Sequence, residues 1–304
     1  MGRLRDRLRI LGLFIGLSVL LYQMYDGINT VSGMDILLQP KLLIASVGLS
    51  TWAIFCQIFA WLIIMRGIGV NITLKDAIKG YVLNFLPRYI PGTVWGYLSR
   101  ATWLNKSFGV EYQLTHWGSI IEVVIGIESC MVMLSVYLFS LLPLRLWWTP
   151  ASILLFVLLG SWFILKKISR IPFMGVFKNP FYGLTISMKG WLMATTALWS
   201  NWLIYGMITI LYLNFYGSYP LGMRSILETS TIFSLSWLGG FMVWIFPAGL
   251  GPRDLLLSKG ISTIFSVTQA QANLMAVIIR LTMMFSELVW AIGGMITGGL
   301  RITE

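Results

Sequence analysis

Long apolar runs recur along the sequence and restrict the chain to one class of fold. The runs at residues 42–65, 118–142, 150–165, 191–213 and 274–299 approach or exceed the roughly 20 helical residues that cross a bilayer core. Only 11% of the residues are charged, against about 25% in a soluble domain. A membrane barrel would need alternating segments of about ten residues, whereas these runs are continuous. The sequence therefore predicts an all-α integral membrane protein.

The remaining segments set the expected organisation. Residues 8–25 form an apolar run after a basic start, but no small-residue cleavage site precedes Asp26, so we expect an uncleaved first helix. Regions 81–104 and 226–265 are apolar but interrupted by proline and glycine. We predict one polytopic domain over residues 1–304 with about eight membrane segments, including two broken helices that cross or re-enter. Two such breaks in two halves also suit an internal inverted repeat.

Basic residues predict the orientation of the chain. The net charge is +11, and much of the excess lies in the opening MGRLRDRLR and in residues 166–189. Cytoplasmic loops carry excess Lys and Arg, so we expect a protein of the plasma (cytoplasmic, or inner) membrane with its amino terminus inside. This bias explains the charge without a nucleic-acid partner. Cys56, Cys130 and His116 are scattered, so we expect no metal site, no disulfide framework and no cofactor.

Two short stretches stand out within the apolar sequence: FLPRYIPGTVWGYLSR at 85–100 and IFPAGLGPRD at 245–254. Proline removes a backbone donor and disrupts the preceding turn. Non-helical backbone at membrane depth is tolerated where it is buried in protein or lines a wet cavity. We therefore predict paired broken helices lining a site, with a simple kink as the alternative. The expected backbone breaks are Pro87, Pro91, Gly92, Pro247, Gly249, Gly251 and Pro252.

A helix that restarts after such a break presents unpaired amide groups and the positive end of its dipole, which favours an anion. Pro252 suits the first helical position. Arg253 follows it with a planar fork of donors that matches phosphate oxygens. In the first stretch Thr93 is a candidate cap, and Arg100 lies seven residues on, which places it on the same helical face. Arg88 either snorkels to the interface or contacts substrate.

Charged residues inside apolar segments are costly and usually face an interior or an aqueous path. Arg280 and Glu287 are seven residues apart on one predicted face, with a rise of about 10.5 Å between them, so they are expected to flank a polar cavity. Glu122 and Glu128 are six apart, about 120° around the helix, and do not form one paired-carboxylate site. For Glu122 and Glu287, an ion pair with a buried arginine is as good an interpretation as a direct role.

These residues resemble the membrane domain of the lysylphosphatidylglycerol synthase/flippase family. The resemblance rests on Pro91-Gly92-Thr93-Val94-Trp95-Gly96 with Arg100, on Glu122, on the run from Pro247 to Asp254, and on Arg280. The family usually follows the glutamate with Arg and places an acid four positions after it, but Val123 and Gly126 occupy those places here. It often has glutamate where this chain has Asp254.

The resemblance implies movement of a phospholipid or a related phosphate-bearing, polyprenyl-linked lipid between leaflets, with anionic membrane lipids as partners. The aminoacyl-transferring domain of the full-length synthases is absent from this sequence, so we expect no lipid aminoacylation. The expected substrate contacts are Arg88, Thr93, Trp95, Arg100, Glu122, Arg253, Asp254, Arg280 and Glu287.

Two other functions compete with transport. A membrane enzyme acting on lipid phosphate or lipid-linked sugar would need a general base, nucleophile or metal site, and the acids here are scattered. Glu122, Asp254 and Glu287 are its only candidate acids, so we expect no enzyme and no catalytic residue. A non-transporting membrane scaffold is the third reading. No GxxxxGK[ST] loop is present, which disfavours direct ATP hydrolysis.

Overall fold

The structure is a computed structural model, and every described segment with regular structure is helical. It describes residues 14, 17–19, 21–26, 29, 39–85, 87–89, 95–169, 186–217, 219–243 and 246–296. Half of the predicted first helix, 8–25, lies outside this part of the chain, and its described residues at 14, 17–19 and 21–25 are helical. The prediction of an all-α fold is confirmed for the residues that the structure describes.

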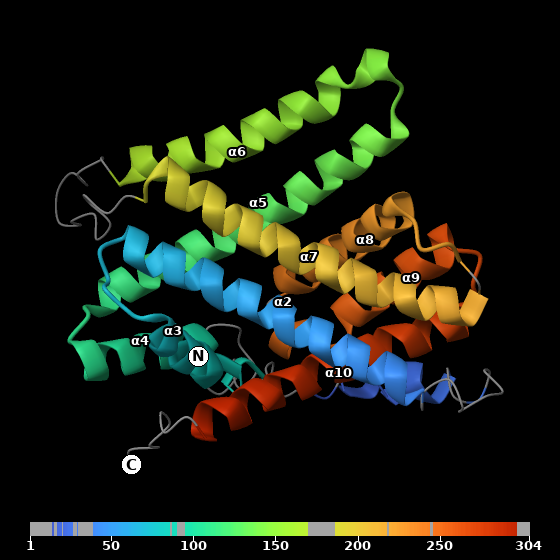
Figure 1. Ribbon diagram of the computed structural model, residues 1–304, viewed down its shortest axis with the longest axis horizontal. Coiled ribbons are helices and arrows are strands. Elements are labelled where there is room, and N and C mark those ends of the chain that lie inside the picture. The colour runs from blue at the N-terminus through green and yellow to red at the C-terminus, as the bar shows by residue number, and fades with distance from the viewer. Residues whose placement is uncertain are drawn as a thin grey trace. The chain divides into compact units, whose positions relative to one another are not determined.

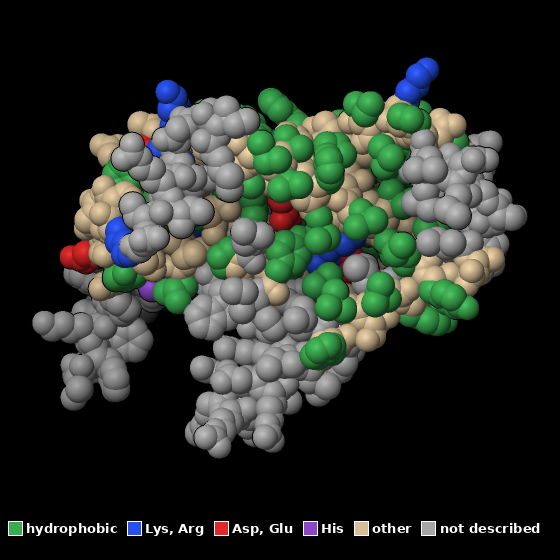
Figure 2. Space-filling view, turned by 90° about the horizontal axis from the view of Figure 1, so that it is seen from below, with side chains coloured by type: hydrophobic (Ala, Val, Ile, Leu, Met, Phe, Trp, Pro, Cys, Tyr) green, Lys and Arg blue, Asp and Glu red, His purple; other side chains and the backbone are tan. Residues whose placement is uncertain are grey.

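Five helices in the described ranges are long and apolar enough to cross a membrane. They are α2 (Pro40–Gly67), α5 (Tyr112–Leu141), α6 (Trp148–Ile168), α7 (Met188–Gly217) and α10 (Gln269–Ile296), drawn in Figure 1. Each contains one of the five apolar runs, except that α5 ends one residue before the predicted end at 142 and that residues 297–299 lie outside the described part of the chain. The prediction of an integral membrane protein is supported by these lengths. Figure 2 shows a face on which hydrophobic side chains cover much of the described surface.

The two interrupted regions are helical hairpins. In the first, α3 (Leu74–Phe85) and α4 (Trp95–Phe108) flank the short turn η2 (Pro87–Tyr89). The hydroxyl of Ser99 donates to the carbonyl of Leu83 at 3.0 Å, and Gly80 lies against Trp103. Contacts that pair later residues of α4 with earlier residues of α3 mean that the two helices run antiparallel.

The second interrupted region repeats this arrangement. Helices α8 (Met223–Met242) and α9 (Pro252–Ile264) flank the turn η4 (Pro247–Gly249). Gly240 lies against Arg253, and Gly260 lies against Ile232, so α8 and α9 also run antiparallel. The predicted breaks are therefore true reversals of the chain and not kinks in a continuous helix.

The chain divides into two compact units, and the boundaries fall within α2, α3, α4 and α7. The first contains residues 1–54, 85–96 and 202–304; the second contains 55–84 and 97–201.

In the first unit, the ring of Tyr205 on α7 stacks on Phe233 of α8 with centroids 4.5 Å apart. Thr229 of α8 donates to the carbonyl of Gly206 at 2.9 Å, which helps to hold these helices together. The turns η2 and η4 both belong to this unit and contact each other.

In the second unit, α5 and α6 pack side by side (Figure 1). Gly118 on α5 lets the side chain of Met65 approach, since an added Cβ would lie 2.7 Å from its sulfur. The fully buried Trp61 and Trp191 fill the interior.

Candidate functional site

The tip of the α8–α9 hairpin has a left-handed backbone. Ala248 has φ 49° and ψ 23°, and Gly249 and Gly251 have φ of 69° and 89°. Glycine adopts this conformation without the clash that a Cβ introduces, and Ala248 is the one non-glycine residue with positive φ in the described ranges. Pro252 then begins α9, as predicted. The positive φ of Ala248, Gly249 and Gly251 separates α8 from α9 in the stretch where the sequence predicts a backbone break.

Arg253 lies in the first turn of α9 and points into the helix bundle. The residue is 6% exposed, its guanidinium carbon lies 4.7 Å from the ring centroid of Phe233, and its Nη2 lies 3.3 Å from the sulfur of Met283. Phe233 belongs to α8 and Met283 to α10, so Arg253 contacts both helices that pack on α9. Gly240 permits this approach, because a Cβ there would lie 2.6 Å from the Cβ of Arg253.

Asp254 caps its own helix. Its carboxylate accepts a hydrogen bond from the amide of Gly251 at 3.2 Å, and the residue is 2% exposed. One amide at the start of α9 is thus already occupied, and a negative charge stands near the positive end of the helix dipole. This contact gives Asp254 a structural task, and its predicted contact with substrate stays a prediction.

Arg280 on α10 connects to the hairpin tip. Its Nη2 donates to the carbonyl of Ala248 at 3.0 Å, and the residue is 3% exposed. The Nε atom of Arg280 is buried without a hydrogen-bond partner. Within the described residues Arg280 forms no ion pair. A buried guanidinium with a carbonyl partner and an unpaired N–H keeps donors available for an anion.

Glu287 on the same helix faces the other turn. The hydroxyl of Tyr89, in η2, lies 3.2 and 3.4 Å from the two carboxylate oxygens of Glu287. Glu287 is 5% exposed. Through these contacts α10 connects to both turns, with Arg280 at η4 and Glu287 at η2. The structure brings Arg253, Arg280 and Glu287 into one unit that also contains both turns.

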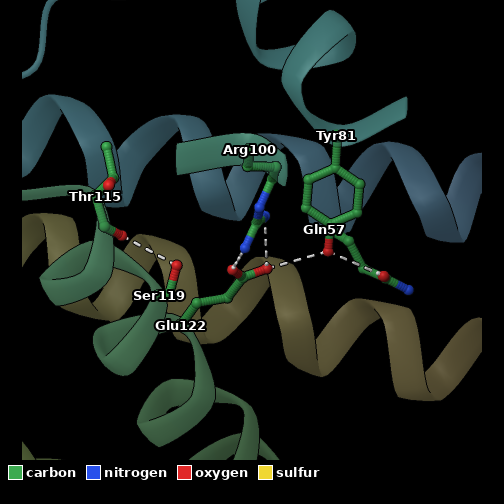
Figure 3. A network of polar contacts seen from close by, with 6 residues as sticks. All are labelled: Gln57, Tyr81, Arg100, Thr115, Ser119 and Glu122. Carbon is green, nitrogen blue, oxygen red and sulfur yellow. Dashed lines mark hydrogen bonds and ion pairs between the residues drawn. The ribbon is translucent and has the colours of Figure 1, made fainter. Parts of the chain in front are cut away.

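Arg100 occupies a closed cluster in the second unit (Figure 3). Its Nη2 lies 2.5 Å from Oε2 of Glu122, which confirms that an ion pair forms at this glutamate. The Glu122 carboxylate also accepts from the hydroxyl of Tyr81 at 3.1 Å. That hydroxyl lies 3.2 Å from Gln57, whose amide donates to Asn201 at 2.8 Å.

Aromatic rings surround the same guanidinium. The carbon Cζ of Arg100 lies 4.9 Å from the ring centroid of Trp61 and 5.1 Å from those of Tyr81 and Tyr97. Arg100 is 2% exposed. A buried arginine with a carboxylate partner and three aromatic neighbours is already compensated. It therefore has less capacity for an added anion than Arg280.

Part of the first break cannot be placed. Pro91, Gly92 and Thr93 lie outside the described residues. Arg88 lies in η2 and Trp95 begins α4, but their side chains also lie outside what the structure describes. Their predicted contacts with substrate stay predictions.

The sequence did not single out several partners of these residues. Tyr81, Tyr89, Phe233 and Met283 each contact a predicted site residue, but in a chain with 14% aromatic residues and 16 methionines nothing marks them. These residues could be identified only once it is known which helices pack against each other.

In the described ranges no three His, Cys, Asp or Glu side chains converge as metal ligands. Cys56 and Cys130 are free and buried, and His116 is exposed with its Nδ1 beside the carbonyl of Tyr112. Comparison of the chain with known protein families, with curated proteins and with solved structures finds no match to any of them.

Proposed function

We propose that this protein is a flippase-like membrane lipid transporter that binds a phosphate-bearing lipid headgroup at the tip of the α8–α9 hairpin. The observation that carries the proposal is Arg280, a buried cation that is joined to a left-handed turn and forms no ion pair with the described residues. A charge at membrane depth without an acidic partner is expensive, and a ligand anion would compensate it. Arg253 supplies a second buried guanidinium at the same tip.

The chemistry of these groups favours phosphate. A guanidinium presents two parallel N–H donors that match two phosphate oxygens. The start of α9 adds the positive end of a helix dipole, which Asp254 offsets in part. A soluble anion could supply the same chemistry, but the apolar surface in Figure 2 favours a ligand whose acyl chains stay in the bilayer.

The two hairpins are proposed to re-enter the membrane without crossing it. At about 1.5 Å per residue, α3, α4 and α9, with 12, 14 and 13 residues, extend roughly 18 to 21 Å, which is short of a hydrocarbon core of about 30 Å. Their antiparallel arms would return each chain segment to the side from which it came. The backbone of the tips would then lie at membrane depth, where broken helices in transporters bind substrates.

Arg100 and Glu122 have a supporting place in this proposal. Their ion pair links α4 to α5 and holds the arm that follows the first break. Arg100 is already paired with Glu122, so we assign the main contacts to Arg280 and Arg253.

Transport in vesicles tests the proposal. The purified protein is reconstituted in phosphatidylcholine vesicles that contain a fluorescent phosphatidylglycerol, and a membrane-impermeant quencher reports the rate at which that lipid changes leaflets. The parent protein is expected to accelerate inversion, and Arg280→Gln and Arg253→Gln to slow it at least tenfold. Arg280→Lys keeps the charge but not the fork and should retain part of the rate.

Arg224→Gln is the matched control, because the Arg224 side chain is 68% exposed and belongs to the surface pair with Glu228. Gel filtration and circular dichroism exclude misfolding of each variant. Parent rates in both Arg280→Gln and Arg253→Gln would show that the assigned site is wrong. An inactive parent protein would favour the scaffold reading, and release of a new lipid product would favour the enzyme reading.

A further inference from the structure

The second unit contains a buried acid to which the proposed function gives no role. Glu128, in the apolar helix α5, is 2% exposed. Its carboxylate oxygens lie 2.8 and 3.0 Å from Nε1 of Trp191, 3.0 Å from Oγ1 of Thr195 and 2.5 Å from Oγ of Ser161. Ser161 belongs to α6, and Trp191 and Thr195 belong to α7. One carboxyl group thus joins three helices.

No cation balances this carboxylate among the residues that the structure describes. Glu122, on the same helix, is engaged with Arg100. Lys166, near the end of α6, lies with its ammonium 4.4 Å from the ring centroid of Trp162. The titratable groups on the three helices, other than Glu128 itself, are Tyr112, His116, Glu122, Cys130, Tyr137, Lys166, Lys167, Lys189, Tyr205, Tyr212 and Tyr216. All the hydrogen bonds that Glu128 accepts come from neutral groups.

The hydrogen bonds of the cluster suit two protonation states. Oγ of Ser161 also lies 2.6 Å from the carbonyl of Val157, and Oγ1 of Thr195 lies 3.0 Å from the carbonyl of Trp191. A hydroxyl has one proton, so each of these side chains chooses between the carboxylate and a carbonyl of its own helix. An ionised Glu128 accepts from both hydroxyls and from the indole.

A protonated Glu128 uses the same contacts in reverse at one position. Its carboxyl proton is donated to Oγ of Ser161, and Ser161 turns its own proton to the carbonyl of Val157. The indole N–H of Trp191 still finds the second oxygen of Glu128. In both protonation states every buried donor and acceptor of the cluster has a hydrogen-bond partner. A buried group that changes its charge usually loses such a partner, and that loss costs free energy.

From this geometry we propose that Glu128 is a reversible proton-binding site at the junction of α5, α6 and α7. A bound sodium ion fits less well, because the indole N–H of Trp191 points at both carboxylate oxygens and repels a cation, while Ser161 and Thr195 supply only two further side-chain oxygens. Proton binding would turn the hydroxyl proton of Ser161 from Glu128 to the carbonyl of Val157, so it would alter the linkage between α5 and α6.

A small cavity lies beside the cluster. Trp191 and Lys166 both line it, and its volume of about 10 Å³ is near the minimum for one water molecule. Because Trp191 also bonds Glu128, it connects the cluster to this cavity at the Lys166 end of α6. The inference does not depend on lipid transport, so its test does not measure lipid movement.

Infrared difference spectroscopy of the purified protein in lipid tests the site directly. Spectra are taken at a series of pH values at which circular dichroism shows the protein to be folded. A carboxylic-acid carbonyl band is expected to appear as the pH falls and to move on exchange into D₂O, and Glu128→Gln should abolish it. Glu228→Gln is the control, because that carboxylate has a basic partner in Arg224 and should leave the band in place.

Thr195→Val supplies a second measurement, which remains informative if Glu128→Gln does not fold. It removes a donor that stabilises the charged carboxylate, so the midpoint of the band should move to higher pH. A band that is absent, is independent of pH, or persists in Glu128→Gln would overturn the inference, as would a midpoint that Thr195→Val leaves unchanged. A midpoint that depends on sodium at constant ionic strength would assign the site to sodium instead.

Discussion

Buried arginines in this protein are stabilised in two different ways. Arg100 has Glu122 at 2.5 Å and three aromatic rings around it, whereas Arg280 has a backbone carbonyl at 3.0 Å and no ion pair with the described residues. The Nε atoms of both arginines are buried without a hydrogen-bond partner. Arg100 therefore fits a structural role, and Arg280 fits a ligand-binding role. Removal of charge at Arg100 should affect folding first, and removal at Arg280 should affect ligand binding first.

Glu122→Gln is expected to destabilise the protein strongly, because it leaves the Arg100 charge buried without an acid. Breaking one side of a buried pair costs about 3–5 kcal/mol. The double variant Arg100→Met/Glu122→Leu should cost less than Glu122→Gln alone, since it removes both charges. The free energy of unfolding is measured by denaturant titration in micelles.

The control for this pair is Glu228→Gln. Its partner Arg224 has a side chain that is 68% exposed, so the change should cost no more than about 1 kcal/mol. A double variant that loses the full sum of its two single variants would contradict the assignment of Arg100 and Glu122 as one buried unit.

Ala248 provides a test of the left-handed turn. Its φ of 49° is unfavourable for a residue with a Cβ, by about 1–2 kcal/mol. Ala248→Gly should be neutral or stabilise by up to about 1 kcal/mol, because relief of the clash exceeds the added freedom of the unfolded chain. Ala248→Val should destabilise by about 1–3 kcal/mol. A melting temperature of Ala248→Val above that of the parent protein would refute a left-handed turn at this residue.

At the scale of elements, the close approach of α8 and α9 depends on glycine. A Cβ at Gly240 would lie 2.6 Å from the Cβ of Arg253 and 3.2 Å from its Cα, so relief requires a shift of backbone. The hairpin therefore presents Arg253 to Phe233 and Met283 only while its arms stay this close.

Gly240→Ala should separate the arms and destabilise the protein by about 1–3 kcal/mol. Gly48→Ala is the matched control, because no atom lies within 4 Å of its added Cβ and alanine favours a helix by about 1 kcal/mol. Thermal unfolding of both variants decides the matter. Equal stability of Gly240→Ala and Gly48→Ala would mean that the hairpin arms are farther apart than the structure has them.

The elements themselves were largely predictable, because apolar length sets a membrane helix and proline with glycine sets a break. The runs at 42–65 and 118–142 became α2 and α5, and Pro252 begins α9 as expected. The reversal of the chain at each break was not predictable. A proline marks where one helix ends, but it does not determine the direction in which the next helix runs. The pairing of Arg100 with Glu122 was also not predictable, because the sequence does not show how far apart two helices lie.

At the scale of the molecule, re-entrant hairpins make the charges of the loops consistent. If α2, α5, α6, α7 and α10 cross and each hairpin returns to its own side, the segments after α2, α4 and α6 lie on one side. That side has Arg66, Lys106, Lys166 and Lys167, whereas the connection between α5 and α6 has Arg145 alone. By the positive-inside rule this arrangement would place the first side in the cytoplasm. A crossing at the first break would place the segment after α2 on the side opposite the segments after α4 and α6.

Labelling of single cysteines by a membrane-impermeant maleimide tests this topology, in a background with Cys56 and Cys130 replaced by alanine. Leu221→Cys and Ser266→Cys flank the α8–α9 hairpin at exposed positions and should be labelled from the same side, together with Leu144→Cys between α5 and α6. Asn71→Cys and Glu111→Cys flank the first hairpin and should be labelled from the opposite, cytoplasmic side. The reporters at 144 and 71 serve as controls, because only α5 and the first hairpin separate them. If Leu221→Cys and Ser266→Cys react from opposite sides, the second break crosses the bilayer. The tip at Ala248 would then no longer end inside the bilayer, and Arg280 would have to reach a headgroup by another path.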